Sequence, residues 1–164
     1  MVDTLGDFVA ALNLTLADLL AGHSERVQLD APMVERMVGK GSEHLIRSML
    51  KFVQGQMSSA QPAIDLIAKY EFAYTAYQRH YTRINGLHSA VYPGVLEGLE
   101  ALLQSGLQLA CLTNKPLGFA RELLKLKNLD GFFTEVFGGD SFERKKPDPL
   151  PLLKTCECLG TSPA

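Results

Sequence analysis

Two short, mostly apolar segments in the second half of the chain constrain its fold more than any other feature. The first covers Leu107 to Leu112 and the second covers Phe132 to Phe137. Each is followed by polar or glycine residues, and a helix-like stretch from Leu117 to Leu126 separates them. Strands that alternate with helices pair in parallel through right-handed crossovers. The second half therefore predicts an α/β fold with a parallel sheet.

Two more helices are expected around this pair of strands. One runs from Val95 to Gln104 with leucines on one side, and the other runs from Pro149 to Leu159. The first strand has few polar positions, so we expect it to be buried on both faces. Two parallel strands are too few for a stable open sheet. Because the chain begins without a predicted strand and stops after a helix, we expect further sequence at both ends.

The first half predicts helices, because its apolar residues recur at intervals of three and four. The predicted helices are one from an Asp3 or Thr4 cap to Gly22, a short one opened by Pro32, one capped by Ser42, and a long one from about Pro62 to Ile84. The apolar positions of the long helix are taken as Ile64, Ile67, Ala68, Phe72 and Tyr74. Four tyrosines form a helical stripe that favours core packing over a binding surface: Tyr70, Tyr74, Tyr77 and Tyr81.

Composition excludes several classes of function. The 164 residues carry a net charge of −2, which argues against a nucleic-acid partner. No apolar run approaches the roughly 18 residues of a membrane span, and the first residues do not form a secretory signal. The odd number of cysteines, 3, suits a reducing cytoplasm. The oligomeric state is left open.

The candidate site residues follow the two predicted strands. Thr113 offers a hydroxyl and Asn114 an amide at the carboxyl end of the first, where a sheet presents its ligand site. Lys146 lies in a basic loop after the second and could neutralise a phosphate. Alone, each is better interpreted as an ordinary turn or a solvated loop. At the ends of adjacent parallel strands, however, they would face one crevice.

One further lysine is a weaker candidate. Lys40 lies between Gly39 and Gly41, at a junction of two predicted helices. It could reach an anionic substrate, and a plain helix break is an equally good interpretation. The four histidines share no metal-ligand spacing.

Five stretches of the chain resemble the haloacid dehalogenase superfamily of phosphohydrolases, and within it the bacterial phosphoglycolate phosphatase branch. They are Val2-Asp3-Thr4, Val38-Gly39-Lys40-Gly41, Tyr92-Pro93-Gly94-Val95, Leu112 through Pro116, and Gly138 through Pro149. The last two are fairly specific. The family usually has asparagine where this chain has Lys40.

The resemblance implies a Rossmann-like core, residues 1–9 and 86–164, with an inserted helical cap over residues 10–85. Thr113 and Lys146 would be catalytic and bind phosphate, while Asn114 and Lys40 would be further substrate contacts. The family's nucleophile motif, Asp-x-Asp-Gly-Thr, and its magnesium motif, Gly-Asp-x-x-x-Asp, would lie outside this sequence. The complete family enzyme is expected to use Mg²⁺, which this chain is not expected to bind, and the implied substrate is a small phosphate ester such as 2-phosphoglycolate.

The chain by itself is therefore expected to be inactive, because the family reaction forms an aspartyl-phosphate on the nucleophile that it lacks. Two alternatives are open. One is a non-catalytic relic or partner-binding helical protein. The other is a different superfamily member, a phosphomutase or a dehalogenase.

Overall fold

The computed structural model describes residues 1–23, 26–57 and 65–163, and the chain divides into two compact units. The helical unit is Thr4–Ser89, and the core unit combines Met1–Asp3 with Ala90–Ala164. No helix among the described residues has the length and apolar character needed to cross a membrane. That the helical unit acts as a cap, bounded at residues 10 and 85, stays a prediction.

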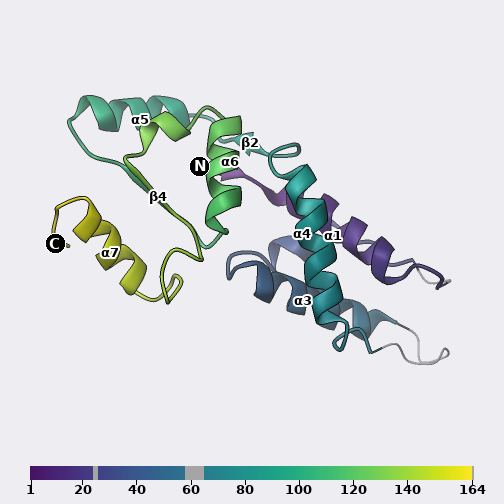
Figure 1. Cartoon of the computed structure of the whole chain (residues 1–164). Coiled ribbons are helices and arrows are strands. Elements are labelled where there is room, and N and C mark those ends of the chain that lie inside the picture. The colour runs from purple at the N-terminus through teal and green to yellow at the C-terminus, as the bar shows by residue number, and fades with distance from the viewer. Residues whose placement is uncertain (24–25, 58–64, 164) are drawn as a thin grey trace. The chain divides into compact units, whose positions relative to one another are not determined.

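Two long helices form the centre of the helical unit. Its helices are α1 (Leu5–Leu19), α2 (Ala31–Glu35), α3 (Ser42–Gln56) and α4 (Tyr70–Ile84). Helices α1 and α4 run alongside each other (Figure 1). Leu12 and Leu16 are buried on α1, and Tyr77 and Tyr81 are each 1% exposed on α4. The ring of Phe8 stacks on Tyr81 with centroids 5.4 Å apart. Core packing is therefore confirmed for these two tyrosines.

Helix α4 begins at Tyr70, so the predicted start near Pro62 is wrong, although residues 58–64 themselves lie outside the described part. Turns precede the helix. Asp65 Oδ1 accepts a hydrogen bond from the Ala68 N–H at 3.1 Å. A short carboxylate that bonds the nearby backbone in this way competes with helical hydrogen bonding.

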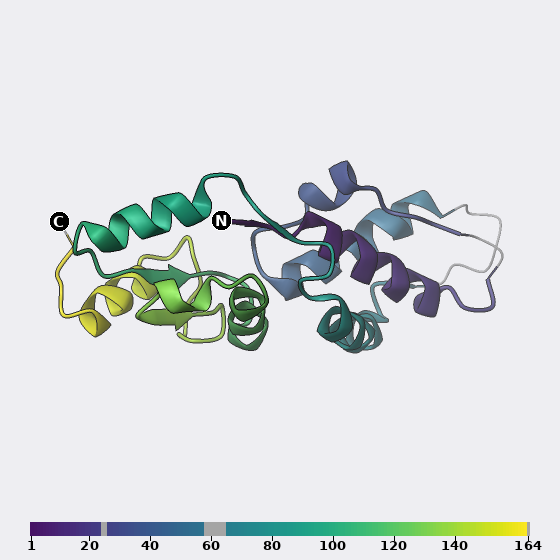
Figure 2. The same ribbon diagram turned by 90° about the horizontal axis from the view of Figure 1, so that it is seen from above.

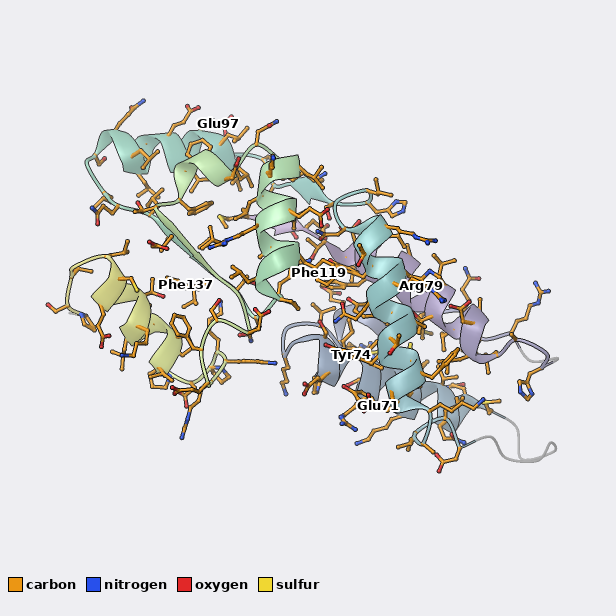
Figure 3. All side chains as sticks on the ribbon, viewed as in Figure 1. Glu71, Tyr74, Arg79, Glu97, Phe119 and Phe137 are labelled. Atoms are coloured by element: carbon orange, nitrogen blue, oxygen red, sulfur yellow. The ribbon has the colours of Figure 1, made fainter. Side chains whose placement is uncertain are left out.

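The predicted apolar face of α4 is also wrong. Ile67, which precedes the helix, is 48% exposed, and Phe72 is 54% exposed. Tyr74, which Figure 3 labels on α4, is only half-buried. The buried positions are Ala73, Ala76, Tyr77, Tyr81 and Ile84. Small alanines on this face let a neighbouring helix approach closely, which a ranking by hydrophobicity alone does not capture.

The helix starts agree with the sequence in part. Thr4 is the N-cap of α1, but its side chain makes no capping bond. Asp30 caps α2 by accepting from the Met33 N–H at 2.9 Å. The predicted Ser42 cap is wrong, because Gly41 occupies the N-cap of α3 with φ 91°. Glycine adopts this left-handed backbone without the strain of a side chain.

A buried carboxylate fastens the end of the helical unit to its beginning. Asp7, on the first turn of α1, has no exposed surface. It accepts from the N–H groups of Gly86 at 2.8 Å and His88 at 2.7 Å, and from the Ser89 hydroxyl. A Cβ on the adjacent Gly6 would lie 2.8 Å from the His88 carbonyl oxygen. The segment after α4 is thus held directly against α1.

The core unit contains the predicted parallel pair of strands. Strand β3 (Ala110–Leu112) pairs in parallel with β4 (Glu135–Phe137), and their arrows lie side by side in Figure 2. The helical elements are α5 (Val95–Gln104), α6 (Leu117–Leu126), the 3-10 helix η1 (Asp130–Phe132) and α7 (Leu150–Cys158). In Figure 1, β4 passes between α5 and α7. The α/β class is confirmed, and α5 has its predicted bounds.

Both strands start later than predicted. The Leu107 N–H donates to the Leu102 carbonyl at 3.2 Å, which ties Leu107 to the end of α5. Phe132 is the last residue of η1. Burial is also lower than expected. Cys111 is 7% exposed, but its strand neighbours Ala110 and Leu112 are only half-buried, so the expectation of burial on both faces is wrong.

Within the described residues, one edge of β3 pairs with β4 and the other edge has no strand beside it. Leu109 accepts from the Thr134 N–H at 2.8 Å, and the Thr113 N–H donates to Phe137 at 3.0 Å. Successive residues of a strand direct their backbone polar groups to opposite edges. Ala110 and Leu112 therefore direct theirs away from β4. Among the described residues, β4 is the single strand paired with β3.

A second, antiparallel ladder was not predicted. Strand β1 (Val2–Asp3) pairs with β2 (Ala90–Val91), so the prediction that the chain begins without a strand is wrong. Two residues are too short a run to show an alternating pattern. The ladder joins the two segments of the core unit, Met1–Asp3 and Ala90–Ala164, at the points where the chain enters and leaves the helical unit.

We expect Asp7→Asn to lower the free energy of unfolding by about 2 kcal/mol, because the amide turns an N–H group toward buried donors. Urea unfolding followed by tyrosine fluorescence measures this, since the chain has no tryptophan and Tyr70, Tyr74, Tyr77 and Tyr81 lie on α4. Asp30→Asn is the matched control. Asparagine caps a helix as well as aspartate does, so its expected change is below about 0.5 kcal/mol. Equal stabilities of the two variants would contradict the prediction.

Candidate functional site

Thr113 lies at the carboxyl end of β3, where the chain turns toward α6. Its N–H extends the ladder to β4 by donating to the Phe137 carbonyl at 3.0 Å. Its hydroxyl oxygen accepts from the Lys115 N–H at 3.1 Å. A hydroxyl that accepts one bond keeps its own O–H to donate. Thr113 is thus fixed by the sheet and has a donor for an anion.

Lys146 reaches the same strand end from the loop that follows β4. Its Nζ donates to the Leu112 carbonyl at 2.7 Å. Leu112 is the last residue of β3 and directly precedes Thr113. This hydrogen bond therefore places a positive charge beside the Thr113 backbone, and two more N–H donors of the ammonium stay available.

Asn114 connects the two loops through both ends of its amide. Its Nδ2 donates to the Lys146 carbonyl at 2.9 Å, and its Oδ1 accepts from the Lys146 N–H at 3.1 Å. The peptide bond from Lys146 to Pro147 is cis. Three of the four candidate residues, Thr113, Asn114 and Lys146, thus lie together. The Asn114 side chain is hydrogen-bonded to the backbone of Lys146.

Two glycines let the backbones of the loops touch. The Gly139 N–H donates to the Lys115 carbonyl at 2.8 Å. A Cβ at Gly139 would overlap the Asn114 carbonyl oxygen, and one at Gly138 would overlap the Leu117 nitrogen. Only glycine permits so close an approach.

Asp140 and Ser141 complete this junction. Asp140 Oδ1 accepts from the Leu117 N–H at 2.8 Å at the start of α6. Ser141 Oγ accepts from the Gly138 N–H at 2.8 Å. Phe137, at the end of β4 in Figure 3, lies against Phe142 with ring centroids 5.0 Å apart. These roles could not be predicted from the sequence, because the capping partner of Asp140 is 23 positions away.

Two further titratable groups near the strand ends, Cys111 and Asp148, have shifted pKa values. Burial raises the pKa of the Cys111 thiol, and the charge of Lys146 acts in the opposite direction. The Leu150 N–H and then the Arg144 guanidinium lower the pKa of Asp148. Asp148 accepts from these two groups at 2.9 and 3.0 Å. The thiol is thus a small apolar side chain, and the carboxylate anchors the start of α7.

The side chains that the structure describes do not form a magnesium site. In residues 1–23, 26–57 and 65–163 no group of three or more histidine, cysteine, aspartate or glutamate side chains is placed to hold a metal ion. Asp140 and Asp148 each bond a helix N-terminus. The described side chains therefore provide no set of ligands for the Mg²⁺ that the family resemblance implies.

Lys40 belongs to the helical unit. It is exposed between Gly39 and Gly41, whose φ angles are 110° and 91°, and it separates α2 from α3. Its role as a substrate contact stays a prediction.

Comparison with known proteins matches nearly the whole chain to one family. The model of the haloacid dehalogenase-like hydrolases matches residues 3–164. The phosphoglycolate phosphatase of Nitrosospira multiformis is 36% identical over 163 residues, which are 99% of this chain and 66% of that protein. The phosphoglycolate phosphatase of Thiobacillus denitrificans is 36% identical over 164 residues, 100% of this chain and 67% of that protein.

The fold is similar over the same range. The crystal structure of a predicted phosphoglycolate phosphatase from Haemophilus somnus matches with a TM-score of 0.83 at 25% identity, covering 98% of this chain and 68% of that one. The likeness supports the Rossmann-like class of the core. The chain spans about two thirds of the length of the curated relatives described above.

We expect Gly139→Ala to destabilise the core unit by about 2 kcal/mol, because the new Cβ meets backbone that cannot move aside. Gly118→Ala in α6 is the matched control. A Cβ there meets nothing within 4 Å, and alanine favours a helix by about 1 kcal/mol over glycine. Thermal unfolding by circular dichroism should therefore show Tm falling for the first variant and unchanged or rising for the second. A Gly139→Ala variant as stable as the parent chain would refute the close approach.

Proposed function

Because this chain belongs to the haloacid dehalogenase-like hydrolase family, we propose that it binds the phosphoryl group of a small phosphate monoester through Lys146 and Thr113. The proposed ester is 2-phosphoglycolate, since the similar proteins of N. multiformis and T. denitrificans are named phosphoglycolate phosphatases. The observation that carries the proposal is the ammonium of Lys146 at the carboxyl end of β3, beside Thr113.

The chemistry of the two side chains supports this assignment. A phosphate monoester carries up to two negative charges and several acceptor oxygens. Lys146 supplies a charge and N–H donors, and Thr113 supplies a hydroxyl donor. Both come from the carboxyl end of a parallel sheet, where open α/β folds bind their ligands.

Binding by these residues does not by itself give hydrolysis. Attack on phosphorus needs an activated nucleophile. In the described part of the core, Asp140 and Asp148 are bonded to helix starts, and Cys111 is a buried thiol with a raised pKa. We therefore propose that these 164 residues alone bind the ester and leave it intact.

We expect Lys146→Ala to weaken binding of inorganic phosphate by about 10- to 100-fold, the loss of one charge-assisted hydrogen bond of about 1.5–3 kcal/mol. Isothermal titration of the purified chain measures this. Lys145→Ala, the exposed neighbour, removes the same charge and should change affinity less than about twofold. Equal effects of the two variants would mean that phosphate meets only a diffuse positive field, and the proposed site would be wrong.

Release of phosphate from 2-phosphoglycolate tests the second half of the proposal. With Mg²⁺ present, the chain should release no more phosphate than Lys146→Ala does, because a binding lysine and threonine cannot replace a nucleophile. Turnover that Lys146→Ala abolishes would overturn the proposed inactivity and leave the binding role of Lys146 intact.

A further inference from the structure

We propose that Asn114 is a positioning residue, which holds Lys146 in place and does not itself bind phosphate. The inference rests on the proposed function of Lys146. It differs from the role that the sequence suggests for Asn114, a further substrate contact. The side-chain amide of Asn114 spans the backbone of Lys146, bonding its N–H at 3.1 Å and its carbonyl at 2.9 Å.

Asn114 is held on the rigid side of this contact. Thr113, the preceding residue, is bonded into the sheet through Phe137. Lys115, the following residue, accepts from the Gly139 N–H at 2.8 Å. Backbone on both sides of Asn114 is therefore fixed by hydrogen bonds to β4 and to the turn that follows it.

Lys146 is on the less regular side. It lies in residues 138–149, which form turns and bends between β4 and α7. Lys146 is exposed, and so are its neighbours Arg144 and Lys145. A lysine on such a loop would otherwise sample many backbone positions and rotamers.

Two anchors together orient the ammonium. Asn114 fixes the backbone of Lys146, and the Leu112 carbonyl fixes its Nζ at 2.7 Å. Between two fixed ends, the four-carbon side chain has few conformations left. Phosphate then meets a cation that is already in position, and preorganisation of this kind raises affinity by lowering the ordering cost of binding.

The same arrangement occurs once more in the described residues, and it provides a matched control. Asn13 donates through Nδ2 to the Leu29 carbonyl at 2.9 Å and accepts from the Leu29 N–H at 2.8 Å. This second pair of hydrogen bonds, between Asn13 and the Leu29 backbone, lies in the helical unit. Asn13→Ala thus removes the same two hydrogen bonds without touching Lys146.

The test is a double-mutant cycle with inorganic phosphate as the probe, on the full chain. We expect Asn114→Ala to weaken phosphate binding about tenfold in the parent chain and by less than about twofold in the Lys146→Ala background. Asn13→Ala should leave affinity unchanged. If Asn114 contacts phosphate directly, Asn114→Ala will weaken binding by a similar factor in both backgrounds, and the proposal is overturned. Unaltered affinity in the parent chain overturns it as well.

Amide hydrogen exchange at Lys146 gives an independent readout. The Lys146 N–H should exchange about tenfold faster in Asn114→Ala than in the parent chain, because its acceptor is gone, while Asn13→Ala leaves its rate unchanged. Equal rates in the parent chain and Asn114→Ala would overturn the positioning role. If Asn114→Ala does not fold, Asn114→Gln takes its place, since the longer side chain cannot make both bonds at the same spacing.

The two proposals fail in different ways. A parent chain that binds no phosphate refutes the proposed function, and exchange at Lys146 then decides the positioning role alone. If Lys146→Ala binds phosphate too weakly for titration, the exchange rate of the Lys146 N–H likewise tests the positioning role.

Discussion

The backbone contact between the two loops is the constraint on which the candidate site depends. Gly138 and Gly139 lie so close to Leu117 and Asn114 that any Cβ would overlap main-chain atoms. This contact sets the loop after β4 against the turn after β3. Asn114, whose backbone lies against Gly139, spans the Lys146 backbone across the same junction. The place of Lys146 beside β3 thus depends on Gly138 and Gly139, which have no side chain.

The sequence predicted best those elements whose cause is local. Helix α5 begins and ends where expected, because Gly94 precedes it and Gly106 follows it, and both adopt positive φ angles. The parallel pair of strands was predicted from apolar runs that end in polar residues. The start of α4 was predicted wrongly, since the turn at Asp65 interrupts an otherwise helical pattern. The ladder of β1 with β2 joins residues about 90 positions apart and is two residues long, so no local pattern could reveal it.

The site shows the same division between local and distant causes. Thr113 and Lys146 could be proposed together from their chemistry and their places after two neighbouring strands, and their role stays a proposal. The hydrogen bonds of the Asn114 amide could not be predicted, because its partner is 32 positions away and is backbone, which every residue possesses. Asp140 likewise reads as a turn residue until α6 is seen against it. Side chains that bond distant backbone leave no pattern in their own neighbourhood, whereas side chains that bond nearby backbone, as in caps and turns, do.

The open edge of β3 has a thermodynamic consequence. The Leu112 carbonyl, which anchors the Lys146 ammonium, is directed away from β4. It is therefore also the group that any strand added at this edge would use as an acceptor. Pairing of a strand at this edge and the bond from the Lys146 ammonium to the Leu112 carbonyl are therefore linked equilibria. An N–H group that a strand brings to this oxygen would weaken its bond to the ammonium. By the reciprocity of linkage, a tighter bond from the ammonium to this oxygen weakens the bond from an incoming strand by the same factor.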